Sequence, residues 1–109
     1  MSPEDEFAAL VENRLKDAEE KTGHIFGDLR KLIEIKGALQ AAQLLLNPSP
    51  IGNFPYGFKV LAAHKLLSNS IEQAAIDSAA SGLFTEEQLT NASTRLTLAK
   101  MMRLGGTDG

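Results

Sequence analysis

The side chains that could do chemistry in this sequence are two histidines, adjacent pairs of carboxylates and several scattered serines. His24 and Asp28 stand four positions apart and could begin a metal site, but a zinc site needs three or four ligands. No further ligand lies near them in the sequence, so no metal is predicted. His64 has no carboxylate close by in the sequence that would orient it as a general base.

The adjacent carboxylates are Glu19-Glu20 and Glu86-Glu87. Neighbours on a helix point about 100° apart, so neither pair can share a proton as a catalytic dyad. The serines lack a nucleophile-elbow context, the glycines form no phosphate-binding loop, and cysteine is absent. We therefore expect no catalytic residue and no cofactor, and predict that the protein is not an enzyme.

Length and charge limit the remaining function classes. A chain of 109 residues suits one domain, predicted over residues 1–104 with a frayed tail at 105–109. The net charge of −3 argues against nucleic-acid binding by the whole surface. No apolar run approaches the ~20 residues of a membrane span, and the acidic start is unlike a secretory signal. We therefore expect a cytoplasmic protein that does not bind membranes.

The elements that must position these residues are helices, because the apolar spacing between the Gly and Pro residues is helical throughout. Expected N-caps are Ser2, Asp28, Ser70 and Thr85. The helix over 38–46 is nearly all apolar and should be central. The spacing thus predicts an all-α fold, a compact orthogonal array of about six short helices around this central apolar helix. The predicted ranges are 3–21, 29–36, 38–46, 58–67, 71–80 and 86–103.

Several of these elements also carry a resemblance. The motifs are Gly37-Ala38-Leu39-Gln40-Ala41-Ala42-Gln43-Leu44-Leu45, Gly57-Phe58, Ser70-Ile71-Glu72, Leu83-Phe84-Thr85-Glu86-Glu87-Gln88-Leu89 and Arg95-Leu96. In them the chain resembles an uncharacterised family of small, roughly hundred-residue all-helical bacterial proteins of unknown function. The resemblance implies a helical fold and carries no catalytic residue. Ala62-Ala63 stands where that family tends to carry a Trp-Glu pair, so any partner contact made by that pair is lost here.

The segment over 47–57 carries the main predicted site. Three prolines exclude a helix interior, and Phe54, Tyr56 and Phe58 fall within five positions. Rigid aromatics make good anchors for a protein partner, so Phe54, Tyr56 and Lys59 are the candidate partner-binding residues. The alternative is that the aromatics cover the core, and a third possibility is that they stack on single-stranded bases.

These observations favour a non-enzymatic accessory or regulatory module that docks on another protein. An inhibitor of a host enzyme, encoded by a phage or mobile element, would be one variant of such a module. The alternative function is a nucleic-acid-binding regulator that uses the basic face of the last helix. That face consists of Arg95, Lys100 and Arg103. Glu86 and Glu87 argue against it, because they would face DNA phosphates at the start of that helix.

Self-association is a further expectation. The last helix carries more apolar residues than one inward stripe needs, and the helix over 38–46 is also almost entirely apolar. An extra apolar strip requires a cover, which a homodimer would provide. The extra residues are Leu98, Met101, Met102 and Leu104.

Overall fold

The structure of the protein is a computed structural model that describes residues 2–47 and 56–101, with Tyr56 described by its backbone only. It contains α1 (Pro3–Thr22), α2 (Gly27–Lys36), α3 (Ala38–Leu46), α4 (Tyr56–Ala63), α5 (Ile71–Asp77) and α6 (Glu86–Met101). Single 3₁₀ turns cover Leu67–Asn69 and Ala79–Ser81. There is no strand in these two ranges, so the predicted all-α fold is confirmed. The predicted tail at 105–109 lies outside the described residues.

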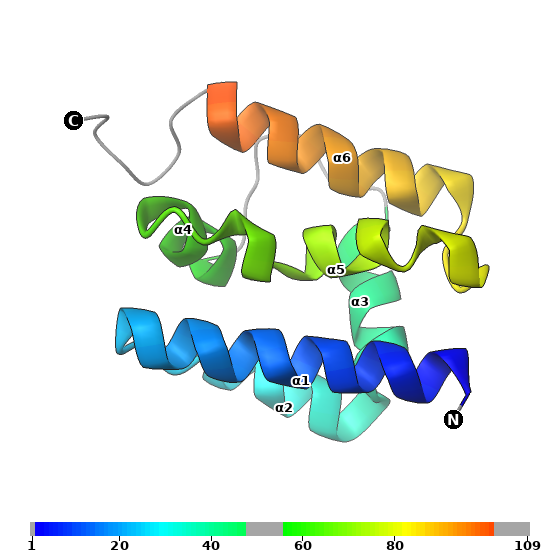
Figure 1. Ribbon diagram of the computed structural model, residues 1–109, viewed down its shortest axis with the longest axis horizontal. Coiled ribbons are helices and arrows are strands. Elements are labelled where there is room, and N and C mark those ends of the chain that lie inside the picture. Colours follow the sequence, from blue (N-terminus) through cyan, green and yellow to red (C-terminus); the bar gives the residue numbers. More distant parts are fainter. Residues whose placement is uncertain (1, 48–55, 102–109) are drawn as a thin grey trace.

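The helices lie in three layers (Figure 1). One layer holds α1 with α2 behind it, the middle layer holds α4 and α5, and α6 covers the far side. Helix α3 runs across these layers and contacts α1, α2, α5 and α6. Its Ala41, Ala42 and Leu46 are completely buried, which confirms that this apolar helix is central. No helix in the described part of the chain has the length and apolar character to span a bilayer.

Helix α1 begins and ends where its capping residues predict. The Asp5 N–H donates to the Ser2 hydroxyl over 3.1 Å, and Gly23 takes a left-handed backbone at φ 73° just past the last turn. One face is buried through Phe7, Val11, Leu15 and Ala18. The stripe spacing therefore predicted this helix correctly, including the side that packs on the core.

Helix α2 begins differently from the prediction. Asp28 does not cap it; the cap position is Phe26, whose backbone N–H donates to the Glu19 carboxylate of α1 over 3.1 Å. Arg30 of α2 then donates to both oxygens of Glu19 and also to Glu12. The Arg30 guanidinium holds the pKa of the Glu19 carboxyl below its usual range. The Glu19 carboxylate of α1 thus accepts a hydrogen bond at the start of α2, where the sequence predicted Asp28 as the cap.

Helix α4 begins two residues earlier than predicted, at Tyr56, so Tyr56 and Gly57 of the segment predicted to be non-helical belong to the helix. It also ends sooner than predicted, at Ala63 rather than near residue 67. Lys65 takes a left-handed backbone at φ 60°, and the Leu66 N–H returns to the Leu61 carbonyl over 2.8 Å. This is the closure of a Schellman motif, where glycine is the usual left-handed residue. Helix α5 likewise ends at Asp77, earlier than the predicted position 80, and a 3₁₀ turn fills the remaining length.

The capping box that precedes α6 is present as predicted. The Gln88 N–H donates to the Thr85 hydroxyl over 3.1 Å, and the Thr85 N–H donates back to the Gln88 side chain over 3.0 Å. Phe84, just before the cap, is buried. The start of α6 is thus defined by its sequence.

Thr85→Ala should lower the free energy of unfolding by about 1 kcal/mol, because the Gln88 N–H loses its acceptor. Urea unfolding followed by circular dichroism measures this change. Thr90→Ala on the exposed face of α6 is the control, since it removes a hydroxyl that caps nothing at the helix start. Equal stabilities for the wild type and Thr85→Ala would contradict the role of this cap.

Candidate functional site

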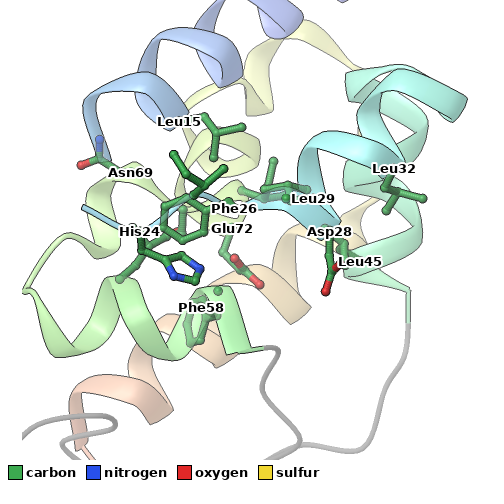
Figure 2. Close-up of a pocket in the computed structure, with 16 residues that line it drawn as sticks. Leu15, His24, Phe26, Asp28, Leu29, Leu32, Leu45, Phe58, Asn69 and Glu72 are labelled. Carbon is green, nitrogen blue, oxygen red and sulfur yellow. The ribbon is translucent and has the colours of Figure 1, made fainter. Parts of the chain in front are cut away.

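A cavity of about 480 Å³ opens between α2, α4 and the start of α5. Its walls are mainly apolar, with Leu15 from α1, Phe26 and Leu29 around the start of α2, and Phe58 and Leu61 from α4. Figure 2 shows the Glu72 side chain pointing into the space between Phe26, His24 and Phe58. This combination of apolar walls and few polar groups, at this volume, is typical of a ligand or side-chain binding site.

Glu72 is placed at the bottom of the cavity by the start of α5. Ser70 caps this helix, because its hydroxyl accepts the Gln73 N–H over 3.1 Å and donates to the Leu67 carbonyl over 2.7 Å. Glu72 follows in the first turn, where the positive end of the helix dipole favours an acid. Its side chain is nevertheless only 5% exposed, so the carboxylate is almost completely removed from bulk water.

The partner of Glu72 is Arg95 of α6. The Arg95 Nη1 donates to Glu72 Oε2 over 2.9 Å, and the Arg95 side chain is only 12% exposed. Burial raises the pKa of the Glu72 carboxyl, and the hydrogen bond from Arg95 opposes that rise. A carboxylate this buried needs a charged partner, and the Glu72–Arg95 ion pair therefore connects α5 to α6.

Another wall of the cavity is formed where the Phe26 ring packs closely on Gly57 of α4. A Cβ added to Gly57 would lie 3.1 Å from Phe26 Cδ1, so the Phe26 ring lies directly against the backbone of α4. His24 packs edge-on against the same ring, with 4.7 Å between centroids. His24 and Asp28, two possible metal ligands by their spacing although no metal was predicted there, both line this cavity. No group of three His, Asp or Glu side chains that could hold a metal occurs in residues 2–47 and 56–101.

Three large apolar residues in the segment that carries α2 are exposed or half-buried. We call them the α2 strip: Ile25, just before the helix, and Leu32 and Ile35 within it. Helix α2 has no buried residue. Ile25 is 65% exposed, Ile35 is 68% exposed, and Leu32 is half-buried at the cavity wall. Large apolar side chains gathered beside an apolar cavity are typical of an interaction surface.

The residues predicted from the aromatic segment are only partly described. Phe54 lies outside the described residues, Tyr56 is the first residue of α4 with its side chain not described, and Lys59 is exposed on α4 outside the cavity wall. Phe58 is buried, as expected of a core residue, and it contributes to the cavity. The assignment of Phe54, Tyr56 and Lys59 to a partner therefore stays a prediction.

The residues of the basic face predicted on the last helix differ in where the structure places them. Arg95 turns inward to Glu72, Lys100 is exposed near the end of α6, and Arg103 lies outside the described residues. Glu86 and Glu87 are exposed at the start of the same helix. Of the residues predicted to favour a dimer, Leu98 packs beside Phe58 and Leu96, and Met101 is 73% exposed. Met102 and Leu104 also lie outside the described residues.

Sequence reasoning missed Glu72 as a site residue and interpreted Ser70-Ile71-Glu72-Gln73 only as a helix cap. A usable signal was present. Ile71, Ala74 and Ala75 leave α5 with little polar surface, so a carboxylate in its first turn had to be near the core. Arg95 stands 23 positions later, and nothing local in the sequence pairs the two.

No protein-family model, curated protein or solved structure matches this chain. The resemblance to a family of small bacterial helical proteins therefore stays a prediction, and the function must be argued from the geometry alone.

Proposed function

We propose that this protein is a non-enzymatic accessory module that docks on another protein through the α2 strip and the adjoining cavity. The observation that carries the proposal is the exposure of Ile25 and Ile35, at 65% and 68%, together with an apolar cavity of about 480 Å³ that Ile25 and Leu32 line. Interfaces are usually dominated by a few apolar anchors that fill a pocket on the partner. Inhibition of a partner enzyme is one form that such docking can take.

The polar groups of the cavity are also better suited to binding than to catalysis. The Ser70 hydroxyl already donates to the Leu67 carbonyl and accepts the Gln73 N–H, so it is not positioned as a nucleophile beside a base. Glu72 is held by Arg95 in an ion pair that joins two helices. Such a pair gives the cavity a fixed acceptor at its base.

The nucleic-acid alternative has less support. Arg95 is mostly buried against Glu72 and cannot reach a phosphate without leaving a carboxylate unpaired. DNA affinity that falls steeply as salt rises, and that Lys100→Gln reduces, would favour this alternative.

Ile35→Asp should abolish capture of the partner, because a charged side chain within the α2 strip cannot be buried against an apolar surface. Stability should change by no more than about 0.5 kcal/mol, since Ile35 is 68% exposed. The measurement is capture on the tagged protein from lysate of its source cells, quantified by mass spectrometry, with thermal melts in parallel.

Lys16→Gln is the matched control, because it makes the same change in net charge at an exposed position on α1. Proteins that are captured by the wild type and by Lys16→Gln, but not by Ile35→Asp, use the α2 strip. Sedimentation of all three proteins separates a second copy from a foreign partner. If Ile35→Asp captures the same proteins as the wild type, the proposed docking surface is wrong.

A further inference from the structure

The polar side chains of the cavity wall are His24, Asp28, Asn69, Ser70 and Glu72. When ionised, Glu72 and Asp28 accept hydrogen bonds and donate none. The Asn69 amide N–H₂ already donates to the Arg14 carbonyl and to Asp17, and the Ser70 hydroxyl already donates to the Leu67 carbonyl. The His24 ring is the remaining side chain of this wall that can donate, and the wall as described contains no lysine or arginine. A group that binds Glu72 or Asp28 must therefore bring its own donor.

Glu72 has acceptor capacity left for such a group. A carboxylate offers about four lone-pair positions on its two oxygens. Arg95 uses one on Oε2 at 2.9 Å, and the backbone N–H of Glu72 itself also donates to the side chain. Hydrogen bonds to a charged acceptor are shorter and stronger than neutral ones, and more so in a site removed from water. A donor that reaches Glu72 is thus strongly preferred over an acceptor.

The apolar side chains of the cavity wall favour a ligand whose buried part is an aliphatic chain. Leu15, Leu29 and Leu61 can surround an aliphatic chain, and the rings of Phe26 and Phe58 stand on either side of Glu72 (Figure 2). Aromatic faces also attract a cation when they lie close to it. Asp28 is exposed and also lines the cavity, where it adds a second negative group.

An aliphatic stem that ends in a donor-only cation is the chemistry of a basic side chain. We propose that the cavity takes a lysine or arginine side chain of the docked protein, with its stem between Phe26 and Leu29 and its charged head donating to Glu72. This inference rests on the proposed docking function, because the side chain comes from a protein partner. The net charge of −3 adds attraction for a basic partner. Ile25 also lines the cavity and is 65% exposed, so it can contact an apolar residue that flanks the inserted side chain in the partner.

The probe for this site is pentylamine, which reproduces the stem and head of an isolated lysine side chain. Pentanol and pentanoate have the same chain length with a neutral or an acidic head. Each is titrated into the full-length protein, and the amide signals of Gly57, Ser70 and Ile71 are followed by NMR. Pentylamine should bind about tenfold more tightly than pentanol, which corresponds to one hydrogen bond to a charged acceptor. Pentanoate should leave these signals unchanged.

Two variants test which carboxylate is responsible. Glu72→Gln keeps a carbonyl oxygen for Arg95 and should bind pentylamine and pentanol equally, since the charge is gone. Asp28→Asn changes an exposed residue and should fold as the wild type does. It should reduce pentylamine binding by about twofold to threefold through the loss of a solvent-screened charge. If Glu72→Gln fails to fold, the preference of the wild type for the amine over the alcohol and the effect of Asp28→Asn still decide the question.

Equal binding of amine and alcohol to the wild type, binding of pentanoate, or no binding of any probe would overturn the inference. Concentration-dependent shifts of the same amides without a probe would assign the cavity to a second copy of this chain and also overturn it. The two proposals fail separately. Amine-selective binding without Ile35-dependent capture keeps the cation site and rejects docking, and the opposite pair of results keeps docking and rejects the cation site.

Discussion

Phe7→Ala should lower the free energy of unfolding by about 3–5 kcal/mol, a large part of the total stability of a domain this size. Phe7 is 1% exposed, and its ring meets Phe84 edge-on with 5.1 Å between centroids. Around it lie Ala38, Ala42 and Ala74, whose short side chains cannot extend into the space that the ring would leave. The cavity would therefore persist, and a persistent cavity makes such a substitution costly.

Urea unfolding followed by circular dichroism measures this loss. Ala8→Ser on the exposed face of the same helix is the control and should change stability little. Phe7→Leu should fall between the two, because it keeps most of the apolar volume and loses only the edge-on ring contact. A Phe7→Ala protein as stable as the wild type would mean that α1 does not pack on α3 and α5 through this residue.

Arg95→Met should lower stability near neutral pH by about 3–5 kcal/mol, because it leaves the buried Glu72 carboxylate without its partner. The loss should depend on pH. Burial already raises the pKa of Glu72, and without the opposing hydrogen bond from Arg95 it rises further. A carboxyl whose pKa is raised on folding favours the folded state below its pKa in the unfolded chain, and this contribution is lost as pH rises through the higher pKa of the folded state. The deficit of Arg95→Met should therefore shrink as the solution is acidified.

The double variant Glu72→Gln with Arg95→Met is the control for this explanation. It removes the unpaired charge and should cost clearly less than Arg95→Met alone near neutral pH. Urea unfolding of the wild type, both single variants and the double variant across the mildly acidic range gives the comparison. A deficit in Arg95→Met that does not vary with pH, or that the double variant shares in full, would contradict the paired-charge account.

The parts of the fold that the sequence predicted are those with local signals. Ser2 and Gly23 mark the two ends of α1, and Thr85 with Gln88 marks the start of α6. Each of these capping contacts joins residues within four positions of one another, so it can be predicted locally. The central place of α3 followed from its nearly uniform apolar composition. These features depend on side chains that act within one or two turns, so a single sequence is enough to predict them.

The parts that were missed depend on contacts between distant segments. Glu19 caps the start of α2 from α1, although Asp28 offered a local alternative. Lys65 takes the left-handed position that ends α4, where a glycine would have been recognised. The cavity requires Phe26 to lie on Gly57, and its carboxylate requires Arg95 from another helix. Apolar periodicity contains no information about which helices will meet.

Helix α2 is held to the rest of the protein by ion pairs as well as by half-buried apolar side chains such as Leu29 and Ile33. It contains no buried residue, and Arg30 connects it to Glu19 and Glu12 on α1. Segments with few buried apolar contacts open locally at low free energy, and ion pairs near the surface weaken as salt screens them. Salt should therefore loosen the attachment of the helix that carries the proposed docking strip more than that of α3, whose Ala41, Ala42 and Leu46 are completely buried. Such a face can adjust its shape to a partner, so its selectivity would depend on ionic strength as well as on surface complementarity.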